Sequence, residues 1–289
     1  MPSSKVESLS VQAGDYLLQF NRRTLVMGIL NVTPDSFSDG GKYINRDDAI
    51  NHGINLAAEG SDIVDIGGES TRPGAEPLSL EDELNRVIPV IKELAKEVQI
   101  PISIDTYKSE VAREALDAGA SIINDISGLK SDDKMAGIAA EYDVPVVVMH
   151  IKGTPRDMQI NPHYENMISE VRNSLAESVN IALNAGVDKN KIIVDPGIGF
   201  GKDLMDNFSL IKNLDYFKSL GHFILIGPSR KSFLWKTLDV SPDETIEATA
   251  AAVTACIMAG ADIVRIHDVK EVMNAVKVAD LIVSAPELN

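Results

Sequence analysis

The sequence has few of the features that mark secreted or membrane proteins. It contains one cysteine, Cys256, so no disulfide can form within the chain, and its small apolar neighbours predict a buried, inert thiol. No apolar stretch approaches the ~18 residues that a membrane helix needs. Met1–Ser10 has neither the basic nor the apolar region of a signal peptide. We therefore expect a cytoplasmic protein with no membrane partner.

Basic residues are also scarce, because 27 Lys and Arg stand against 43 Asp and Glu, a net charge of −16. This balance argues against nonspecific nucleic-acid binding, which draws its affinity from a cationic excess that releases counterions. An anionic small molecule would need a local cluster of Arg and Lys. Aromatic residues make up only 5% of a chain that is 44% hydrophobic. These values predict a large aliphatic core, as in parallel strands covered by helices.

The chain does contain a short β-branched apolar run that ends at a polar residue, and this pattern occurs eight times. The runs are Leu25–Leu30, Ile63–Val64, Ile102–Ile104, Ile122–Ile123, Val144–Met149, Ile192–Val194, Phe223–Ile226 and Ile263–Val264. The polar residues that end them are Asn31, Asp65, Asp105, Asn124 with Asp125, His150, Asp195, Ser229 with Arg230, and Arg265 with His267. Since a buried strand interior does not tolerate unpaired polar groups, each of these residues marks a strand end.

The segments between the runs are patterned as helices. Ser79 precedes a run with apolar residues on one helical face, and residues 241–244 (SPDE) are a helix start signal. Glycines that suit a left-handed helix end stand before the next strand at positions 60, 119, 186 and 260. Strands that alternate with single helices predict a parallel sheet.

Eight such units predict an α/β fold, the (β/α)8 TIM barrel, as a single domain over residues 23–289. An open doubly wound sheet is less suitable, because no Gly-x-Gly-x-x-Gly turn follows the first strand. Residues 1–22 form an N-terminal extension, in which Val11–Phe20 could be a hairpin around Gly14 and Asp15 that closes the barrel floor.

Barrels of this kind place their active sites at the carboxyl ends of the strands, where the polar residues above would meet. Two of the loops that leave these ends are long, residues 31–45 and 67–79. Both are rich in Gly, Pro, Ser and Asp, and long loops in compact domains are often lids. We expect them to be mobile without ligand and to close over a substrate.

Seven motifs stand at these strand ends in a fixed order. They are MGILNVTPDSFSDGG at 27–41, DIGGESTRPGA at 65–75, IDT at 104–106, NDISG at 124–128, DPGIGFGK at 195–202, SRKS at 229–232 and RIHD at 265–268. In this order, from about residue 25 to the C-terminus, the chain resembles the dihydropteroate synthases of folate biosynthesis. The resemblance implies condensation of (7,8-dihydropterin-6-yl)methyl diphosphate with 4-aminobenzoate, membership of an enzyme class that sulfonamides target, and a homodimer formed through the late helices.

The resemblance assigns the pterin to Asp105, Asn124, Asp195, Lys231, Arg265 and Met149. A pterin presents a ring N–H beside an exocyclic amine, and a carboxylate accepts such a pair as it accepts an Arg fork. Asp195 would take this edge, and Asp105 would face the ring on its reacting side. A lone Asp at a strand end is more often a helix cap or turn former, so the ordered motifs carry these assignments. For Asp65 and His150 we expect structural roles, Asp65 in holding the second loop.

The resemblance assigns the diphosphate to Asn31, Thr71, Arg265 and His267. Asn31 would also be the protein ligand of Mg²⁺, a cofactor that keeps several waters and uses few protein atoms. The aminobenzoate site would comprise Phe37, Thr71, Arg72, Pro73, Phe200, Lys231 and Ser232. Arg72, Lys202, Arg230, Lys231 and Arg265 would together form a basic mouth for the two anionic substrates.

Catalysis would rest on Asp105, Lys231, Arg265 and Asn31. We expect dissociative substitution, in which the diphosphate leaves first and Asp105 stabilises the ring cation that remains. Lys152, Trp235 and Ala248 depart from the usual family pattern, and Lys152 would change the charge near the mouth. Two alternatives stay open: a pterin-dependent methyltransferase of related barrel fold and a catalytically silent pterin-binding protein.

Overall fold

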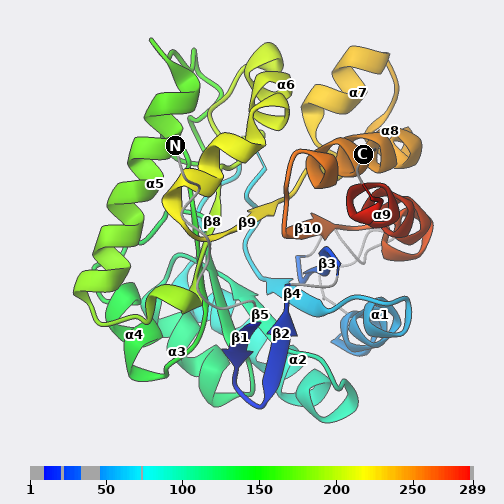
Figure 1. Ribbon diagram of the computed structural model, residues 1–289. Coiled ribbons are helices and arrows are strands. Elements are labelled where there is room, and N and C mark those ends of the chain that lie inside the picture. The colour runs from blue at the N-terminus through cyan, green and yellow to red at the C-terminus, as the bar shows by residue number, and fades with distance from the viewer. Residues whose placement is uncertain (1–9, 21–22, 34–45, 73, 287–289) are drawn as a thin grey trace.

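The computed structural model describes residues 10–20, 23–33, 46–72 and 74–286. Eight parallel strands close a barrel in the order β10-β3-β4-β5-β6-β7-β8-β9 (Figure 1). They are β3 (Leu25–Asn31), β4 (Ile63–Gly67), β5 (Ile102–Asp105), β6 (Ile122–Asp125), β7 (Val146–Met149), β8 (Ile192–Asp195), β9 (Phe223–Ile226) and β10 (Ile263–Ile266). Each of the eight expected strands is present, and the TIM-barrel prediction is confirmed.

Helices follow the strands and cover the outside of the barrel (Figure 1). They are α1 (Arg46–Ala58), α2 (Leu80–Glu97), α3 (Ser109–Asp117), α4 (Met135–Glu141), α5 (Met167–Asn184), α6 (Leu204–Lys212), α7 (Ser232–Leu238), α8 (Ile246–Met258) and α9 (Val269–Ser284). Short 3-10 turns lie at Lys189–Lys191, Leu214–Leu220 and Pro242–Glu244. No helix among the described residues is long and apolar enough to cross a membrane.

The helix punctuation is mostly as expected. Ser79 caps α2, where its hydroxyl accepts from the backbone N–H of Asp82 at 3.1 Å. The four helix-end glycines all have left-handed backbones, with φ between +97° and +116°. The start signal at residues 241–244 is confirmed: its capping box forms and opens a 3-10 turn that leads into α8. The Thr245 hydroxyl closes that turn on the Pro242 carbonyl at 2.7 Å, and α8 begins one residue later.

The lower half of the barrel interior is apolar and is closed by the expected hairpin, β1 (Ser10–Ala13) and β2 (Tyr16–Gln19). Val11 and Leu18 of the hairpin pack against inward-facing strand residues such as Ile193. The Phe20 ring stacks on Phe223 with 3.7 Å between centroids. The hairpin therefore seals the floor of the barrel, as predicted.

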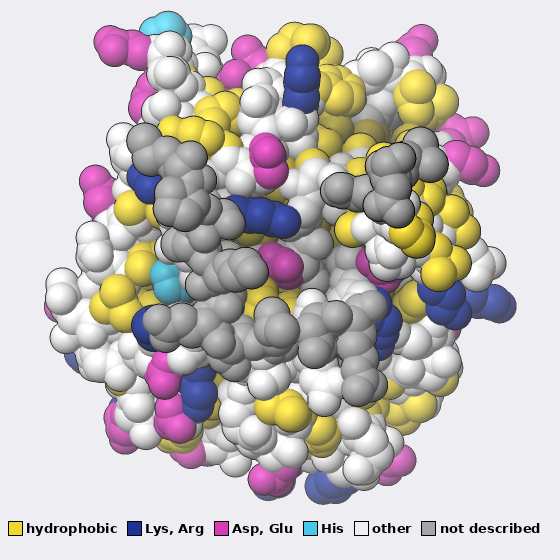
Figure 2. Space-filling model, in the orientation of Figure 1, with side chains coloured by type: hydrophobic (Ala, Val, Ile, Leu, Met, Phe, Trp, Pro, Cys, Tyr) yellow, Lys and Arg dark blue, Asp and Glu magenta, His cyan; other side chains and the backbone are white. Residues whose placement is uncertain are grey.

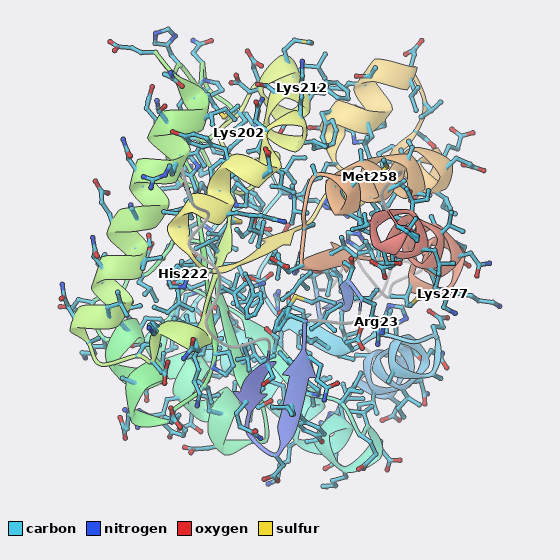
Figure 3. All side chains as sticks on the ribbon, in the orientation of Figure 1. Arg23, Lys202, Lys212, His222, Met258 and Lys277 are labelled. Atoms are coloured by element: carbon cyan, nitrogen blue, oxygen red, sulfur yellow. The ribbon has the colours of Figure 1, made fainter. Side chains whose placement is uncertain are left out.

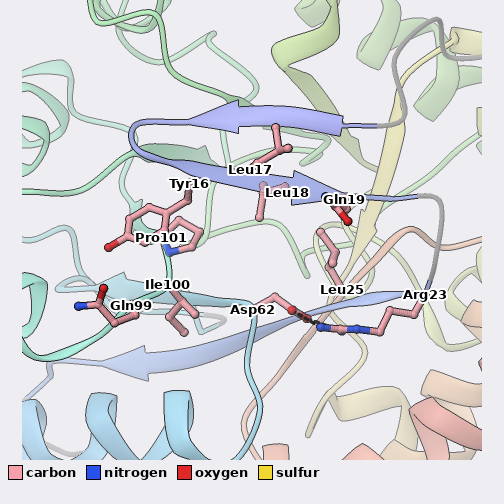
Figure 4. Close-up of a pocket in the computed structure, with 10 residues that line it drawn as sticks. All are labelled: Tyr16, Leu17, Leu18, Gln19, Arg23, Leu25, Asp62, Gln99, Ile100 and Pro101. Carbon is pink, nitrogen blue, oxygen red and sulfur yellow. Dashed lines mark hydrogen bonds and ion pairs between the residues drawn. The ribbon is translucent and has the colours of Figure 1, made fainter.

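One hollow of about 370 Å³ lies between the hairpin and the amino-terminal strand ends, lined by residues 16–19, 23, 25, 62 and 99–101 (Figure 4). Its charged groups are already paired. Arg23 forms a two-pronged ion pair with Asp62, whose carboxylate also accepts from the Val26 N–H at 2.8 Å. The hollow is at the opposite end of the barrel from the polar strand ends, and it contains no unmatched charge that would select a ligand.

Candidate active site

The strand pairing brings the polar strand ends into one ring. Asn31 lies opposite Gly67, Gly67 opposite Asp105, and Asp105 opposite Asn124. Further round, Met149 lies opposite Asp195. Residues that are far apart in the sequence therefore meet at the carboxyl end of the barrel, where the sequence placed the site.

Arg265 joins two carboxylates at the centre of this ring. Its Nε donates to Asp65 at 2.6 Å and its Nη2 donates to Asp105 at 2.7 Å. The Asn124 amide donates to the same Asp65 oxygen at 3.0 Å. Asp65, which is fully buried, therefore fixes the orientation of both Asn124 and Arg265.

This contact corrects the role expected for Asp65. We expected it to hold the second loop, but its side chain points into the barrel, two residues beyond the inward-facing Ile63. Strand alternation could have indicated this, because residues i and i+2 share a face. Asp65 is thus a positioning residue for two predicted pterin contacts.

Burial dominates the electrostatics of the carboxylates. It raises the pKa of Asp105 from 3.8 to about 7, against the opposing charge of Arg265. It raises the pKa of Asp195 from 3.8 to about 6, against a 2.7 Å hydrogen bond from the Gly197 N–H and the charge of Lys231. Each ionised carboxylate lacks solvation, so a ligand edge with two N–H donors would stabilise it.

Lys231 and Phe200 form one wall of the site. The Lys231 ammonium lies 4.0 Å from the centre of the Phe200 ring. Burial lowers its pKa to about 8, and the charge of Arg265 adds to this effect. Gly199 has φ +83°, and a Cβ there would lie 3.2 Å from the Lys231 Cδ. The positive φ therefore favours glycine at this position, and any larger residue would also press on the lysine side chain.

An apolar surface continues from Phe200. Met149 and Phe200 belong to a small cluster of buried apolar side chains, together with Ile126 and Met158. A flat heteroaromatic ring could lie on such a surface while its polar edge meets Asp195 and Asn124. The arrangement suits a ligand with apolar faces and a hydrogen-bonding rim.

Among the predicted anion-binding residues, His267 follows Arg265 at the end of β10 and is close enough to feel its charge. The ring of His267 is neutral, because burial lowers its pKa to about 3 and the charge of Arg265 adds to this. Its Nδ1 lies 3.1 Å from the Ser229 hydroxyl, so its other nitrogen is left for a ligand. His267 would thus bind an anion by hydrogen bonding and not by charge. Asn31, at the end of β3, makes no side-chain hydrogen bond within the described part of the chain.

The other predicted residues are placed as follows. Ser232 is the first residue of α7, directly after Lys231. Thr71 is half-buried and Arg72 exposed in the second loop. Phe37 and Pro73 lie outside the described residues, as does most of the first loop.

One of the expected contributions to a basic mouth was wrong. Lys202 is only 1% exposed and its ammonium points into the protein, because three acceptors hold it there. The charge of Lys152 is matched by Glu170 at 3.6 Å, and its ammonium lies 3.9 Å from the Tyr164 ring centre. Among the residues that the structure describes, Arg265 and Lys231 bring positive charge to the ring of polar strand ends.

The sequence reasoning missed a buried ionic cluster beside Asp105. Lys108 pairs with both Glu69 and Glu83, the Thr106 hydroxyl donates to Glu83 at 2.7 Å, and the Tyr107 hydroxyl donates to Glu69 at 2.5 Å. The cluster ties the base of the second loop to the residues that follow Asp105. One signal was available: Glu83 shares a helical face with the buried Val87 and Leu94 of α2.

No group of three or more His, Cys, Asp or Glu residues in the described ranges could hold a metal ion. A structural metal centre of the usual kind is therefore not found there. Mg²⁺ has a different requirement, because it is bound by few protein oxygens together with phosphate oxygens and water. The amide oxygen of Asn31 satisfies that requirement.

Comparisons with known proteins agree with this geometry. A family model described as pterin binding enzyme matches residues 27–267. The dihydropteroate synthase of Bacillus subtilis (strain 168) is 51% identical over 263 residues, which are 91% of this chain and 90% of the relative.

Solved structures give the same result. A Yersinia pestis dihydropteroate synthase, solved as a sulfonamide drug complex, superposes with a TM-score of 0.91 at 39% identity, over 96% of this chain and all of the other. A Xanthomonas albilineans dihydropteroate synthase with 4-aminobenzoic acid superposes with a TM-score of 0.90 at 41% identity, over the same shares of the two chains.

Proposed function

The chain belongs to the pterin-binding enzyme family and is a dihydropteroate synthase, a transferase, and from this premise we propose how its residues carry the reaction. The enzyme condenses (7,8-dihydropterin-6-yl)methyl diphosphate with 4-aminobenzoate and forms 7,8-dihydropteroate and diphosphate. The observation that carries the proposal is the buried network in which Arg265 joins Asp65 and Asp105, beside Asn124 and Asp195.

The pterin ring lies between the polar rim and the apolar wall. Asp195 accepts the ring N–H and the exocyclic amine, and Asn124, held by Asp65, meets the neighbouring edge atoms. Lys231 reaches the acceptor atoms of the ring, and Met149 supports one face. Two charge-assisted hydrogen bonds to a buried carboxylate are the strongest contacts available in such a site.

The diphosphate lies toward Asn31, Thr71, Arg265 and His267. Arg265 supplies positive charge, and the neutral His267 supplies a hydrogen bond. Asn31 would hold Mg²⁺ through its amide oxygen, with the other ligands coming from the diphosphate and water. When bound, the ion neutralises part of the diphosphate charge.

The aminobenzoate occupies a slot formed by Lys231, Ser232, Phe200, Thr71 and Arg72. Lys231 or Arg72 pairs with its carboxylate, and the Phe200 ring borders its apolar face. The related enzyme from Xanthomonas albilineans was solved with 4-aminobenzoic acid, which supports a dedicated slot for this substrate.

The condensation proceeds by dissociative substitution. Departure of the diphosphate leaves a cation delocalised over the electron-rich pterin, and the ionised Asp105 stabilises it across the ring. The neutral amine of the aminobenzoate then attacks the methylene carbon and loses a proton. No protein nucleophile is needed. Closure of the two long loops would exclude water, which would otherwise capture the cation.

The alternatives fit this chain less well. A methyltransferase that passes a methyl group from a folate has no diphosphate to release, and Arg265 with His267 would then have no anion to bind. A silent pterin-binding protein has no use for Asn31, Lys231 and Arg265 together, and this chain retains all three.

The enzyme acts as a homodimer through its last two helices. The outer face of α9 exposes Val278, Leu281, Ile282 and Val283, each at 50–70%, and Met258 of α8 is 58% exposed. Hydrophobic side chains are visible over this region at the right of Figure 2. Such a contiguous patch is typical of a protein interface. Sedimentation of Leu281→Glu as a monomer, with the wild type as a dimer, tests this arrangement.

Condensation activity tests the function directly. Purified protein with both substrates and Mg²⁺ should form dihydropteroate and diphosphate, a sulfonamide should compete with aminobenzoate, and a chelator should reduce the rate. Transfer of a methyl group without condensation would show the methyltransferase alternative instead. Pterin binding without any turnover would identify the silent binding protein.

A further inference from the structure

Lys202 is the largest fully buried side chain among the described residues, and no carboxylate pairs with it there. It lies near the start of α6 (Figure 3). A buried ammonium is costly unless hydrogen bonds replace its lost hydration. Here its Nζ donates to the Gly197 carbonyl at 2.7 Å and the Phe200 carbonyl at 3.1 Å, and it lies 3.0 Å from the Nδ1 of His150. Burial lowers the pKa of Lys202 to about 7, against the charge of Asp195, and the ammonium form has one proton for each of these three acceptors.

The acceptors come from two neighbouring segments. Two of them belong to the turn that follows β8, and His150 stands directly after β7. The turn has an unusual backbone, with φ values of +70° at Gly197, +83° at Gly199 and +65° at Gly201. A Cβ on Gly197 would lie 1.9 Å from the His150 carbonyl oxygen, so the two segments are in close contact. Lys202 therefore holds together a turn that few sequences could adopt.

His150 is suited to accept a hydrogen bond from Lys202. Burial lowers its pKa to about 2, and the positive charges of Lys202 and Lys130 add to this effect. The imidazole is therefore neutral near pH 7. With Nδ1 as acceptor, its own proton is on Nε2.

The same turn carries groups of the pterin site. The Gly197 N–H donates to the Asp195 carboxylate at 2.7 Å, and so fixes its direction. Phe200 presents its ring to the Lys231 ammonium. The carbonyls of these two turn residues, Gly197 and Phe200, are the ones that Lys202 holds. A displacement of the Lys202 ammonium would thus move the Asp195 carboxylate and the Phe200 ring together.

We propose that Lys202, with His150 as its neutral acceptor, is a positioning residue that shapes the turn from Asp195 to Gly201 for the pterin. This inference rests on the proposed pterin site. Neither side chain needs to touch a substrate. It gives a role to His150, for which the sequence suggested only structure, and explains why Lys202 points inward.

The test measures kcat/KM for the dihydropterin diphosphate in Lys202→Met, in Asp195→Asn and in the double variant. Lys202→Met removes the donors but keeps the length and apolar body of the side chain, and Lys130→Met is a control at a more exposed lysine that bonds Ser174 and Glu177. Misplacement of a binding group costs on the order of 10²-fold in rate. We expect roughly that loss for Lys202→Met and none for the control. In the Asp195→Asn background the same change should cost less than about 3-fold, since residues that act as a unit are not additive.

His150 provides a second pair of variants in case Lys202→Met does not fold. The Asn oxygen of His150→Asn can replace Nδ1 as acceptor, so this variant should retain most of the activity, while His150→Phe should lose as much as Lys202→Met. Equal kcat/KM in folded Lys202→Met and wild type would overturn the proposal. Fully additive losses in the double variant would do the same, because Lys202 would then not act through Asp195.

Calorimetry with pteroate separates this proposal from the proposed function. If the wild type binds no pteroate, the pterin site itself is wrong. If the wild type binds pteroate and Lys202→Met binds it equally well, the site stands and the positioning role is wrong. Unchanged melting temperatures with weakened binding would support positioning, because a merely structural role would lower the melting temperature first.

Discussion

The same strands line both ends of the barrel interior. The residues that face inward at the floor and those at the polar end stand two positions apart in the sequence. At the floor, Ile63, Ile122, Ile193 and Ile263 point inward in an apolar layer that the hairpin covers. Two residues later the same strands present Asp65, Asn124, Asp195 and Arg265. One end is thus built for packing, and the other places charges where the fold must bury them. The comparison places apolar packing at one end and the ionisable site residues at the other end of one set of strands.

Burial of carboxylates at the charged end is unfavourable for the free energy of the folded protein without a ligand. Burial raises the pKa of both Asp105 and Asp195, which means that the folded protein disfavours the ionised form that the ligand needs. One oxygen of Asp65 is buried with no partner among the described residues. A substrate with N–H donors and positive character in its transition state would offset this energy. Active sites commonly gain specificity in this way.

Asp195→Ala should give the largest effect and should act only at the charged end. Each charge-assisted hydrogen bond is worth about 1.5–3 kcal/mol, so loss of two bonds should weaken pterin affinity by roughly 10²- to 10⁴-fold. The free energy of unfolding should not fall, because a buried charge is removed. Calorimetric titration with a pterin and denaturant unfolding measure the two quantities. Unchanged affinity would remove Asp195 from the site.

Arg265→Met should come next and should affect both quantities. It leaves the Asp65 and Asp105 carboxylates buried without their cation, and removal of one partner from a buried pair costs about 3–5 kcal/mol. The matched control is Arg230→Met at the same end, where a 36% exposed arginine pairs with Asp268 and its loss should cost about 1 kcal/mol or less. Equal losses of unfolding free energy in the two variants would contradict the central role of Arg265.

Leu18→Ala tests the apolar end. The side chain is 4% exposed in the layer that seals the floor, and truncation of a buried leucine costs about 2–4 kcal/mol. Because the hairpin lies far from the polar strand ends, kcat/KM per folded molecule should stay at the wild-type value. Thermal unfolding and steady-state kinetics on the same preparation check this separation. A parallel loss of kcat/KM would mean that the floor also sets the geometry of the site.

The same comparison explains how much the sequence could predict. The eight strands, the hairpin and the helix-end glycines follow from local periodicity and turn chemistry, and all were found. The site residues that end a strand were also found together. Asp65 and Lys202 were misassigned because their roles depend on contacts across the barrel, Asp65 with Arg265 and Lys202 with His150. The start signal at 241–244 was found as well, as a capping box that opens a 3-10 turn directly before α8.

The pH dependence of stability should show the smallest effect and should distinguish the two ends once more. The pKa of Asp195 is raised from 3.8 in its ordinary state to about 6 in the fold, so its contribution to stability is present below pH 4 and is lost as the pH rises through 6. Asp195→Asn lacks this loss. Relative to wild type, its unfolding free energy should therefore increase by about 1–3 kcal/mol between pH 4 and pH 8, at 1.36 kcal/mol per pKa unit.

Leu18→Ala provides the control for this measurement, because an apolar truncation at the floor should differ from wild type by the same amount at every pH. Urea unfolding of the three proteins without ligand, across that range, gives both differences. A pterin added at pH 8 should stabilise the wild type and leave Asp195→Asn unchanged, since only the ionised carboxylate gains two donors. If the difference in unfolding free energy between Asp195→Asn and wild type stays constant with pH, the charged end is solvated. The binding energy must then come from the apolar wall around Phe200 and Met149.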